Sequence, residues 1–426
     1  MKKVKTLDKR LQKIADDIKV KFGLDAYKLA THSIHKERNS LGEAYYKFNM
    51  EFFPNVISGK YEEDINPEGT AIVEYNIQKE IIESVIFVEG KSLATNTHFP
   101  NKTEQEVGNW IESETGLIYS ENFVVTDVLE NGFQFSPNIR EVEITPAGMI
   151  EVEFDDEGKL TSYQLYDPIP SNGDLVETEF TLTLEEIEPF VKGQLQLVNF
   201  PFEAEKRFVP VYAMEEVYVT LDGTRSIPFL EHERLEVKVD EVIEWTEPLT
   251  GELVREQIDS LSEATVDDAL EGKDVAEKLV VTADQIEQSL AIVRDVFRSD
   301  FPEESGIWKL ETLQRLEHFI KATCIMDETT SSVFNRQVVV LINPETMTLL
   351  NYVDNGEVFE IFDTFAPAEK AAVSHEDAFE RLVSYISLTP TYVYDSVTEK
   401  YILCGLLDAA EGINAVTGEI VPLTDF

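Results

Sequence analysis

Apolar residues recur at helical spacing in two stretches of the chain, and each stretch precedes segments of alternating polarity. The apolar positions are Leu11, Ile14, Ile18 and Phe22 in the first stretch, and Ile286, Leu290, Val293 and Phe297 in the second. A spacing of three and four residues places such side chains on one face of a helix. Strand-like segments follow in both cases, among them AYYKFNMEF at 44–52 and RQVVVLINPETMTLLNYVD at 336–354. The pattern predicts a helix followed by antiparallel strands in each region.

Two later segments, 183–229 and 374–423, resemble each other from a helix through to a closing hairpin. Each begins with an N-cap residue and two acidic residues that suit the positive end of a helix. An apolar strand then opens with a basic residue and an aromatic one, and a tight turn with glycine leads to a short strand that ends in proline. The similarity predicts an internal repeat. The matched positions are Thr183 and Ser374, Arg207-Phe208 and Lys400-Tyr401, Asp222-Gly223 and Thr417-Gly418, and Pro228 and Pro422.

A further unit is predicted between these landmarks. Thr103 is an N-cap residue, and Glu106 three residues later fits a capping box. Strand-like runs follow at FVVTDVL, GMIEVEFDD and KLTSYQLY. Between about 240 and 280 the composition becomes acidic and less aromatic, which favours a boundary there.

The chain has 426 residues, more than one hydrophobic core usually serves, so several domains are expected. The predicted ranges are a first unit at 1–95, a second α+β unit at 100–172, a third unit at 180–240 that closes the first lobe, an acidic linker at 241–280, and a second lobe at 281–426 made of units 281–365 and 372–426.

Three segments resemble the YcdB/YcdC repeated-domain family, which is itself similar to PepSY (peptidase-propeptide) domains. They are INAVTGEIVPL at 413–423, YVTLDGTRSIPF at 218–229 and VVVLINPETMTLLNY at 338–352. With the repeats, the resemblance covers most of the chain, and its motifs are short and structural. It implies an α+β fold of tandem repeated units, each a helix packed on a curved antiparallel sheet, as in PepSY and cystatin-like domains.

The same resemblance implies a role in inhibiting or modulating secreted peptidases, and roles at the cell envelope. Family members commonly carry an export signal, and none is visible in this sequence. No catalytic residue can be transferred from the family, because its pattern contains none.

The net charge of the chain restricts the kinds of molecule that it is expected to bind. Thirty-six Lys and Arg residues against 82 Asp and Glu residues give a formal net charge of −46. Such a surface repels nucleic-acid phosphates and anionic lipids, so neither nucleic-acid binding nor membrane insertion is expected. A basic peptide, a basic protein face or a multivalent cation would be attracted instead. The simpler interpretation is that the acidic residues keep a large protein in solution.

The two cysteines, Cys324 and Cys404, each lie in an apolar run and are expected to be small buried residues. The sequence leaves open whether a disulfide joins them. The N-terminal stretch is basic, but no apolar run of signal-peptide length follows it, and no segment reaches the ~20 apolar residues of a membrane span. A cytoplasmic location is therefore the default expectation.

Histidine and nucleotide motifs give no catalytic assignment. His32 and His35 are three residues apart and could meet on a helix, but a zinc-peptidase helix needs a four-residue step with a glutamate after the first histidine. Surface histidines are the simpler explanation, and His318 is expected to be packed or solvated. The sequence contains no GxSxG, GxxxxGK or GxGxxG motif. No catalytic, cofactor-binding or metal-binding residue is assigned, and no cofactor is expected.

Carboxylate-rich turns and aromatic runs are the remaining candidates. FDDEGK at 154–159 and YVDNGE at 352–357 gather oxygens at a turn, but ordinary hairpin chemistry explains both better than a calcium loop. The runs YYKFNMEFF at 45–53 and LVNFPF at 197–202 could form a binding face, although their strand context favours core packing.

The function predicted from these observations is a non-enzymatic binding or regulatory protein of the PepSY-like class. Its partner would be a protein, such as a peptidase that it modulates, or an extended peptide that adds to an open sheet edge. An acidic surface favours a basic partner. Two alternatives stay open: a scaffold protein that assembles with copies of itself, and a hydrolase whose site is built from distant carboxylates.

Overall fold

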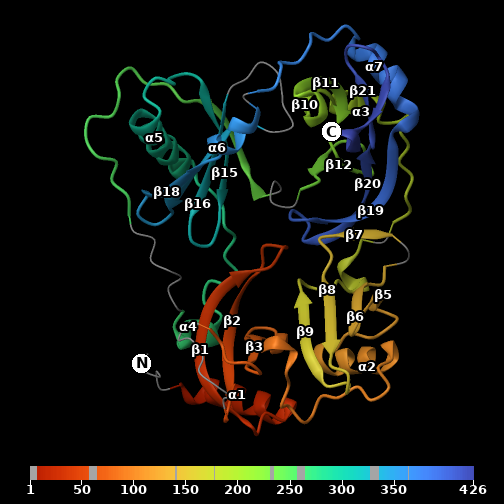
Figure 1. Ribbon diagram of the computed structural model, residues 1–426, viewed down its shortest axis with the longest axis vertical. Helices are drawn as coiled ribbons and strands as arrows, with labels where there is room; N and C mark the ends of the chain where they lie inside the picture. The colour runs from red at the N-terminus through yellow and green to blue at the C-terminus, as the bar shows by residue number, and fades with distance from the viewer. Residues whose placement is uncertain are drawn as a thin grey trace. The chain divides into compact units, whose positions relative to one another are not determined.

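A computed structural model describes residues 7–56, 65–139, 142–176, 178–230, 235–256, 264–326, 335–362 and 364–426. The chain divides into two compact units (Figure 1). The first unit comprises Met1–Val176, Leu261–Lys278 and Tyr392–Ile402, and the second comprises Glu177–Ser260, Leu279–Thr391 and Leu403–Phe426. Each unit is therefore built from segments that are far apart in the sequence.

An antiparallel eight-stranded sheet of order β1-β2-β3-β4-β9-β8-β6-β5 forms the centre of the first unit. Alternate residues of β2, such as Phe48 and Phe52, are fully buried in the core that the sheet shares with helices α1 and α2. The residues between them lie on the opposite face, because successive side chains of a strand point to opposite sides. The bounds are β1 (Tyr27–Arg38), β2 (Ala44–Pro54), β3 (Ala71–Asn76), β4 (Ile81–Phe87), β5 (Phe123–Leu129), β6 (Gly132–Pro137), β8 (Met149–Phe154), β9 (Leu160–Tyr166), α1 (Lys9–Phe22) and α2 (Glu104–Thr115).

Local chemistry determines where the helices begin and end. Thr103 caps α2 by accepting a hydrogen bond from the amide of Glu106, as the sequence predicts. The Glu106 carboxylate accepts a hydrogen bond from the amide of Asn101, whereas the predicted capping box would use the amide of Thr103. Helix α1 ends at Gly23, whose φ of 66° lies in the left-handed region that glycine adopts without a steric penalty.

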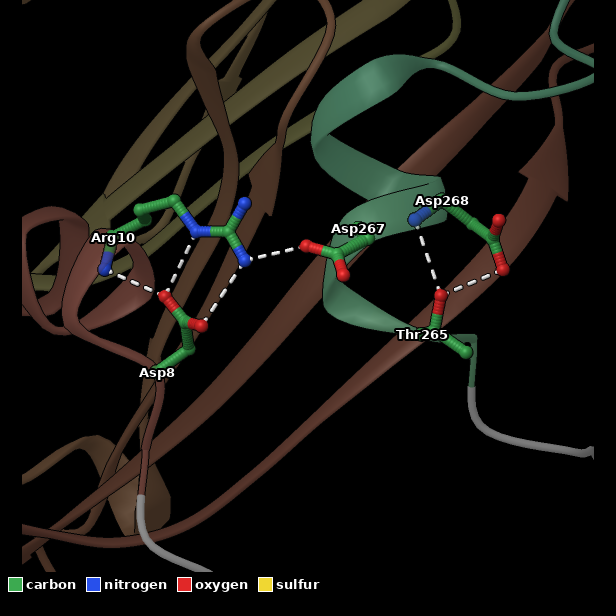
Figure 2. Close-up of polar contacts among 5 residues, drawn as sticks. All are labelled: Asp8, Arg10, Thr265, Asp267 and Asp268. Carbon is green, nitrogen blue, oxygen red and sulfur yellow. Dashed lines mark hydrogen bonds and ion pairs between the residues drawn. The ribbon is translucent and has the colours of Figure 1, made fainter.

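Helix α4 (Val266–Glu271) packs onto the first unit from a distant part of the chain. Ala269 is fully buried in the core of the eight-stranded sheet. Figure 2 shows the polar side of this contact, where the Arg10 guanidinium lies between Asp8 and Asp267. Its Nε is 3.0 Å from Asp8, and its Nη2 is 2.7 Å from Asp267. The Arg10 hydrogen bonds lower the pKa of Asp8 to about 2.

The second unit contains a five-stranded sheet of order β14-β15-β16-β17-β18. Helix α5 (Ala283–Asp300) covers it with Val293 and Phe297, and Thr282 with Gln285 forms a capping box at its N-terminus. The strand bounds are β14 (Val237–Val242), β15 (Trp308–Arg315), β16 (Ile320–Met326), β17 (Gln337–Asn343) and β18 (Thr348–Asp354).

The segments 183–229 and 374–423 exchange their strands. One sheet has the order β10-β11-β21-β22 and the other the order β13-β12-β20-β19-β7, so the long hairpin of each segment is extended by the short hairpin of the other. The first segment supplies α3 (Glu188–Gln194), β10 (Leu195–Phe202), β11 (Arg207–Met214), β12 (Val217–Thr220) and β13 (Ser226–Pro228). The second segment supplies α7 (His375–Leu382), β19 (Ser387–Asp395), β20 (Lys400–Asp408), β21 (Glu411–Asn414) and β22 (Ile420–Pro422). Strand β7 (Glu143–Thr145) comes from an earlier part of the chain.

The pairing registers of the two exchanges are equivalent. In one exchange Val211 of β11 pairs with Asn414 of β21, and in the other Cys404 of β20 pairs with Thr220 of β12. Val211 and Cys404 each lie four residues after the first residue of their strand, and Asn414 and Thr220 each lie three residues after theirs. Neither segment therefore completes a sheet alone, and both contribute to one shared core.

The predicted fold class is wrong. The sequence pattern indicates an α+β chain of tandem units, each a helix on its own curved antiparallel sheet, whereas the structure is mostly β, with four sheets and few helices. Strand β4 pairs with β9, so strands assigned to two separate units join in one sheet. The physical reason is that open strand edges pair with any suitable neighbour, and periodicity identifies a strand without identifying its partner.

Candidate functional site

The histidines considered in the sequence do not gather. Strand β1 places His32 and His35 on opposite faces, because they are an odd number of residues apart in a strand. His32 contacts the Phe48 ring, and His35 Nε2 lies 3.0 Å from Ser33 Oγ. His318 is exposed. Among the described residues, no group of three or more His, Cys, Asp or Glu side chains could hold a metal ion.

Both cysteines are buried, as expected of small core residues. Cys324 lies in β16 and Cys404 in β20, which belong to different sheets. Burial raises the pKa of the Cys324 thiol, which disfavours the reactive thiolate.

The two acidic turns use their carboxylates on the backbone. Asp155 accepts hydrogen bonds from the amides of Glu157 and Lys159, both at 2.9 Å, and Asp354 accepts one from the amide of Gly356 at 2.8 Å. Such bonds are typical of tight turns. No helix in the described part of the chain is long and apolar enough to cross a bilayer.

The aromatic run at 45–53 belongs half to the core and half to the opposite face. Tyr46 and Phe48 are buried, whereas Tyr45 and Lys47 alternate with them on the face away from α1 and α2. The run at 197–202 forms β10, where Phe200 and Phe202 pack against Phe426.

A cavity lies on that opposite face of the first sheet. It has a volume of about 340 Å³ and lies where β1 and β3 end, where β2 and β4 begin, and beside the end of β9. We name it the Lys47 hollow. Polar side chains line it, among them those of Tyr45, Lys47, Glu74, Asn76 and Glu83.

Three carboxylates from three strands surround the Lys47 ammonium. Lys47 Nζ is 2.8 Å from Glu37 of β1, 3.1 Å from Glu74 of β3 and 3.9 Å from Glu83 of β4. The side chains of Lys47 and Glu83 are only 15% and 16% exposed. Asn76 donates a hydrogen bond to the other Glu83 oxygen at 2.8 Å. Cross-strand neighbours explain this meeting, since Lys47 on β2 lies between β1 and β3 in the sheet.

Burial governs the protonation of these groups. It raises the pKa of Glu83, although the Asn76 hydrogen bond and Lys47 act in the opposite direction. Burial also raises the pKa of the Tyr45 hydroxyl, and the charge of Glu83 adds to the effect. For Lys47, burial favours the neutral form, but Glu37 and the other nearby anions outweigh it and raise the pKa. Lys47 therefore remains an ammonium at neutral pH.

The hollow carries an excess of negative charge. The three carboxylates around Lys47 exceed its single positive charge, and the other two charged side chains that line the hollow, Lys79 and Asp167, cancel each other. The formal charge is therefore −2, before any proton bound by Glu83. Such an arrangement attracts a second cation with hydrogen-bond donors, such as an ammonium or a guanidinium.

The sequence reasoning missed this cluster. The signal that could have found it is the alternation in β2, where Tyr45, Lys47 and Asn49 occupy every second position between buried residues. The contributing glutamates come from other strands, so the cluster exists only after the sheet has formed.

Comparisons with known proteins give little information about the family or the function of this chain. No family model matches the chain, and no curated protein matches it. The family suggested by the sequence motifs therefore stays a prediction. Among solved structures, the Bacillus megaterium YpeB C-terminal domain is similar at 9% sequence identity and a TM-score of 0.25, over 82% of this chain and 97% of that chain. A likeness of this size assigns neither a fold nor a function to the chain.

Proposed function

We propose that this chain is a non-enzymatic binding protein that accepts a cationic side chain of a protein or an extended peptide in the Lys47 hollow. The observation that carries the proposal is the excess of carboxylates around one ammonium in half-buried surroundings. The net charge of −46 supports it, because a strongly acidic surface accelerates the approach of a basic partner.

The expected affinity for a single cationic side chain is weak. A unit charge at 4 Å from an opposite charge gains about 4 kcal/mol at an effective dielectric constant of 20. Desolvation of the incoming cation and its repulsion from Lys47 offset part of this gain. We therefore expect a dissociation constant in the millimolar range, and the loss of two carboxylates should weaken affinity by about tenfold or more.

A peptide titration tests the proposal. A fluorescent ten-residue alanine-based peptide with a central Arg-Lys pair is titrated with the full chain, and the same peptide with citrulline and norleucine serves as the uncharged probe. The expected result is millimolar binding of the basic peptide alone, weakened at least tenfold by Glu74→Gln with Glu83→Gln. The control Asp156→Asn with Glu157→Gln removes two carboxylates from the exposed turn between β8 and β9 and should leave the affinity within twofold. Equal weakening by both double variants would show general attraction and refute a specific site.

One observation favours a second candidate, a carboxylate-based hydrolase. Glu74 and Glu83 both lie within 4 Å of the same nitrogen, and the pKa of Glu83 is raised by burial. Pairs of carboxyl groups in different environments serve as acid and base or nucleophile in glycoside hydrolases. Release of nitrophenol from a panel of nitrophenyl glycosides, lost in Glu83→Gln, would favour this candidate over a binding protein.

A further inference from the structure

A short segment of the chain lies against the open edge of the second unit's five-stranded sheet. Strand β18 is the last strand of that sheet. The segment Leu253–Glu256, which we name the strap, follows this edge, and the amide of Glu256 donates a hydrogen bond to the carbonyl of Leu349 at 2.8 Å. The strap thus begins to extend the sheet in the way a bound peptide does.

The turn between β17 and β18 holds the strap's carboxylate with neutral donors. Asn343 Nδ2 donates to one Glu256 oxygen at 3.0 Å, and Thr346 Oγ1 donates to the other at 2.9 Å. The hydroxyl of Thr348 donates to the same oxygen as Thr346. These hydrogen bonds, that of Thr348 foremost, lower the pKa of Glu256. The turn is therefore a receptor for a carboxylate.

A second receptor, for a cation, lies next to the first. The guanidinium carbon of Arg255 is 4.9 Å from the centre of the Tyr352 ring, and its Nη2 is 3.6 Å from Asp300. Its Nη1 donates to the side chain of Asn351 at 3.4 Å. The Tyr352 hydroxyl donates to Asp300 and so fixes the ring against which the guanidinium lies. The aromatic face of Tyr352, the carboxylate of Asp300 and the amide oxygen of Asn351 together favour an arginine or a lysine at this position.

The strap is held mainly by exposed side chains. Val254 is 82% exposed, the Arg255 side chain is 44% exposed, and Leu253 is half-buried against the core of the sheet. Exposed ion pairs and single hydrogen bonds contribute little to stability. Beyond the strap, β18 continues with Val353, which is 58% exposed. A longer peptide could bond to more of this edge than the strap does.

We infer that the β18 edge and the β17–β18 turn form a docking site for an extended peptide in which a basic residue directly precedes an acidic one. The strap, with Arg255 and Glu256, occupies the site until such a peptide displaces it. A basic–acidic pair has no net charge, so the acidic surface of the protein does not oppose its binding. This site consists of residues of the second unit and is independent of the Lys47 hollow.

The test uses the strap's own sequence as the probe. A peptide LVRE with an amidated C-terminus, matching the strap at 253–256, carries a neutral fluorophore and is titrated with the full chain and with the Arg255→Ala, Glu256→Ala variant, whose own strap no longer competes. The expected result is at least tenfold tighter binding to the variant. Replacing arginine by citrulline and the final glutamate by glutamine in the peptide should weaken binding at least tenfold.

Receptor variants make the test specific. Thr346→Val with Thr348→Val, added to the strap variant, should weaken binding at least tenfold, whereas Thr126→Val on β5 in the same background should have no effect. Circular dichroism melting curves confirm that each variant is folded. Any of three results would overturn the inference: the peptide binds the full chain and the strap variant with equal affinity, it binds neither of them, or it still binds fully after both threonine hydroxyls are lost. Concentration-dependent dimerisation of the strap variant in light scattering would also overturn it, because a second copy would then occupy the edge.

Discussion

The strand exchange in the second unit makes a specific prediction for Ile413→Ala. Ile413 is fully buried in β21, pairs with Tyr212 of β11, and lies in a core that contains both Val191 of the first segment and Leu382 of the second. Truncation of a buried isoleucine to alanine costs about 2–5 kcal/mol, because the lost transfer free energy adds to that of the cavity. We take about 3 kcal/mol, which corresponds to a change of roughly a hundredfold in an equilibrium constant.

Hydrogen–deuterium exchange with peptide-level mass spectrometry measures where this loss appears. Because β21 completes the sheet of β10 and β11, amides of 195–214 should exchange roughly a hundredfold faster in Ile413→Ala, together with those of 411–422. The matched control is Ile342→Ala, an equally buried isoleucine of β17 in a separate core. It should accelerate exchange in 337–354 and leave 195–214 unchanged. Unaltered exchange of 195–214 in Ile413→Ala would refute the exchange of strands.

Three further predictions concern single groups. Burial raises the folded-state pKa of Glu83 above 4.5, so the folded state binds this proton more tightly than the unfolded state does, and Glu83 lowers stability as pH rises from about 4.5 through the raised value. In urea unfolding, Glu83→Gln should therefore gain stability relative to the wild type between pH 4 and pH 7. A difference in stability that stays constant over this range would contradict the prediction. Gly23→Ala should lower the free energy of unfolding by about 1–2 kcal/mol or more in the same assay, since φ is 66° and a Cβ would lie 2.2 Å from Thr95 Oγ1. An unchanged unfolding midpoint would show that the alanine causes no strain. Cys324 and Cys404 should react with Ellman's reagent only after unfolding, and rapid labelling of the native protein would show that they are accessible.

Local structure could be predicted from the sequence where neighbouring residues determine it. Ser374 was expected to cap a helix, and it accepts a hydrogen bond from the amide of Asp377 at the start of α7. The run at 45–53 was expected in a strand with aromatic residues in the core, and β2 buries Tyr46 and Phe48. The acidic turn at 154–159 was expected to be a hairpin, and Asp155 bonds its backbone accordingly.

Strand partners and the hollow could not be predicted, for a common physical reason. Each strand satisfies its alternating pattern with any partner of suitable length, so the sequence does not reveal that β4 pairs with β9 or that β11 pairs with β21. The Lys47 cluster likewise depends on the pairing of β1, β2, β3 and β4, since the glutamates around Lys47 come from three other strands. The acidic composition points to a cationic partner, but it does not identify which of the 82 acidic residues would meet it.

Zero-length cross-linking tests the binding account most directly. A carbodiimide joins an ammonium to a carboxylate only when the two are in contact. A lysine-bearing peptide incubated with the full chain and a carbodiimide should form an amide with Glu74 or Glu83, located by mass spectrometry after digestion, and an excess of unlabelled basic peptide should suppress it. Cross-links spread over exposed acidic residues, with none at Glu74 or Glu83, would contradict the account.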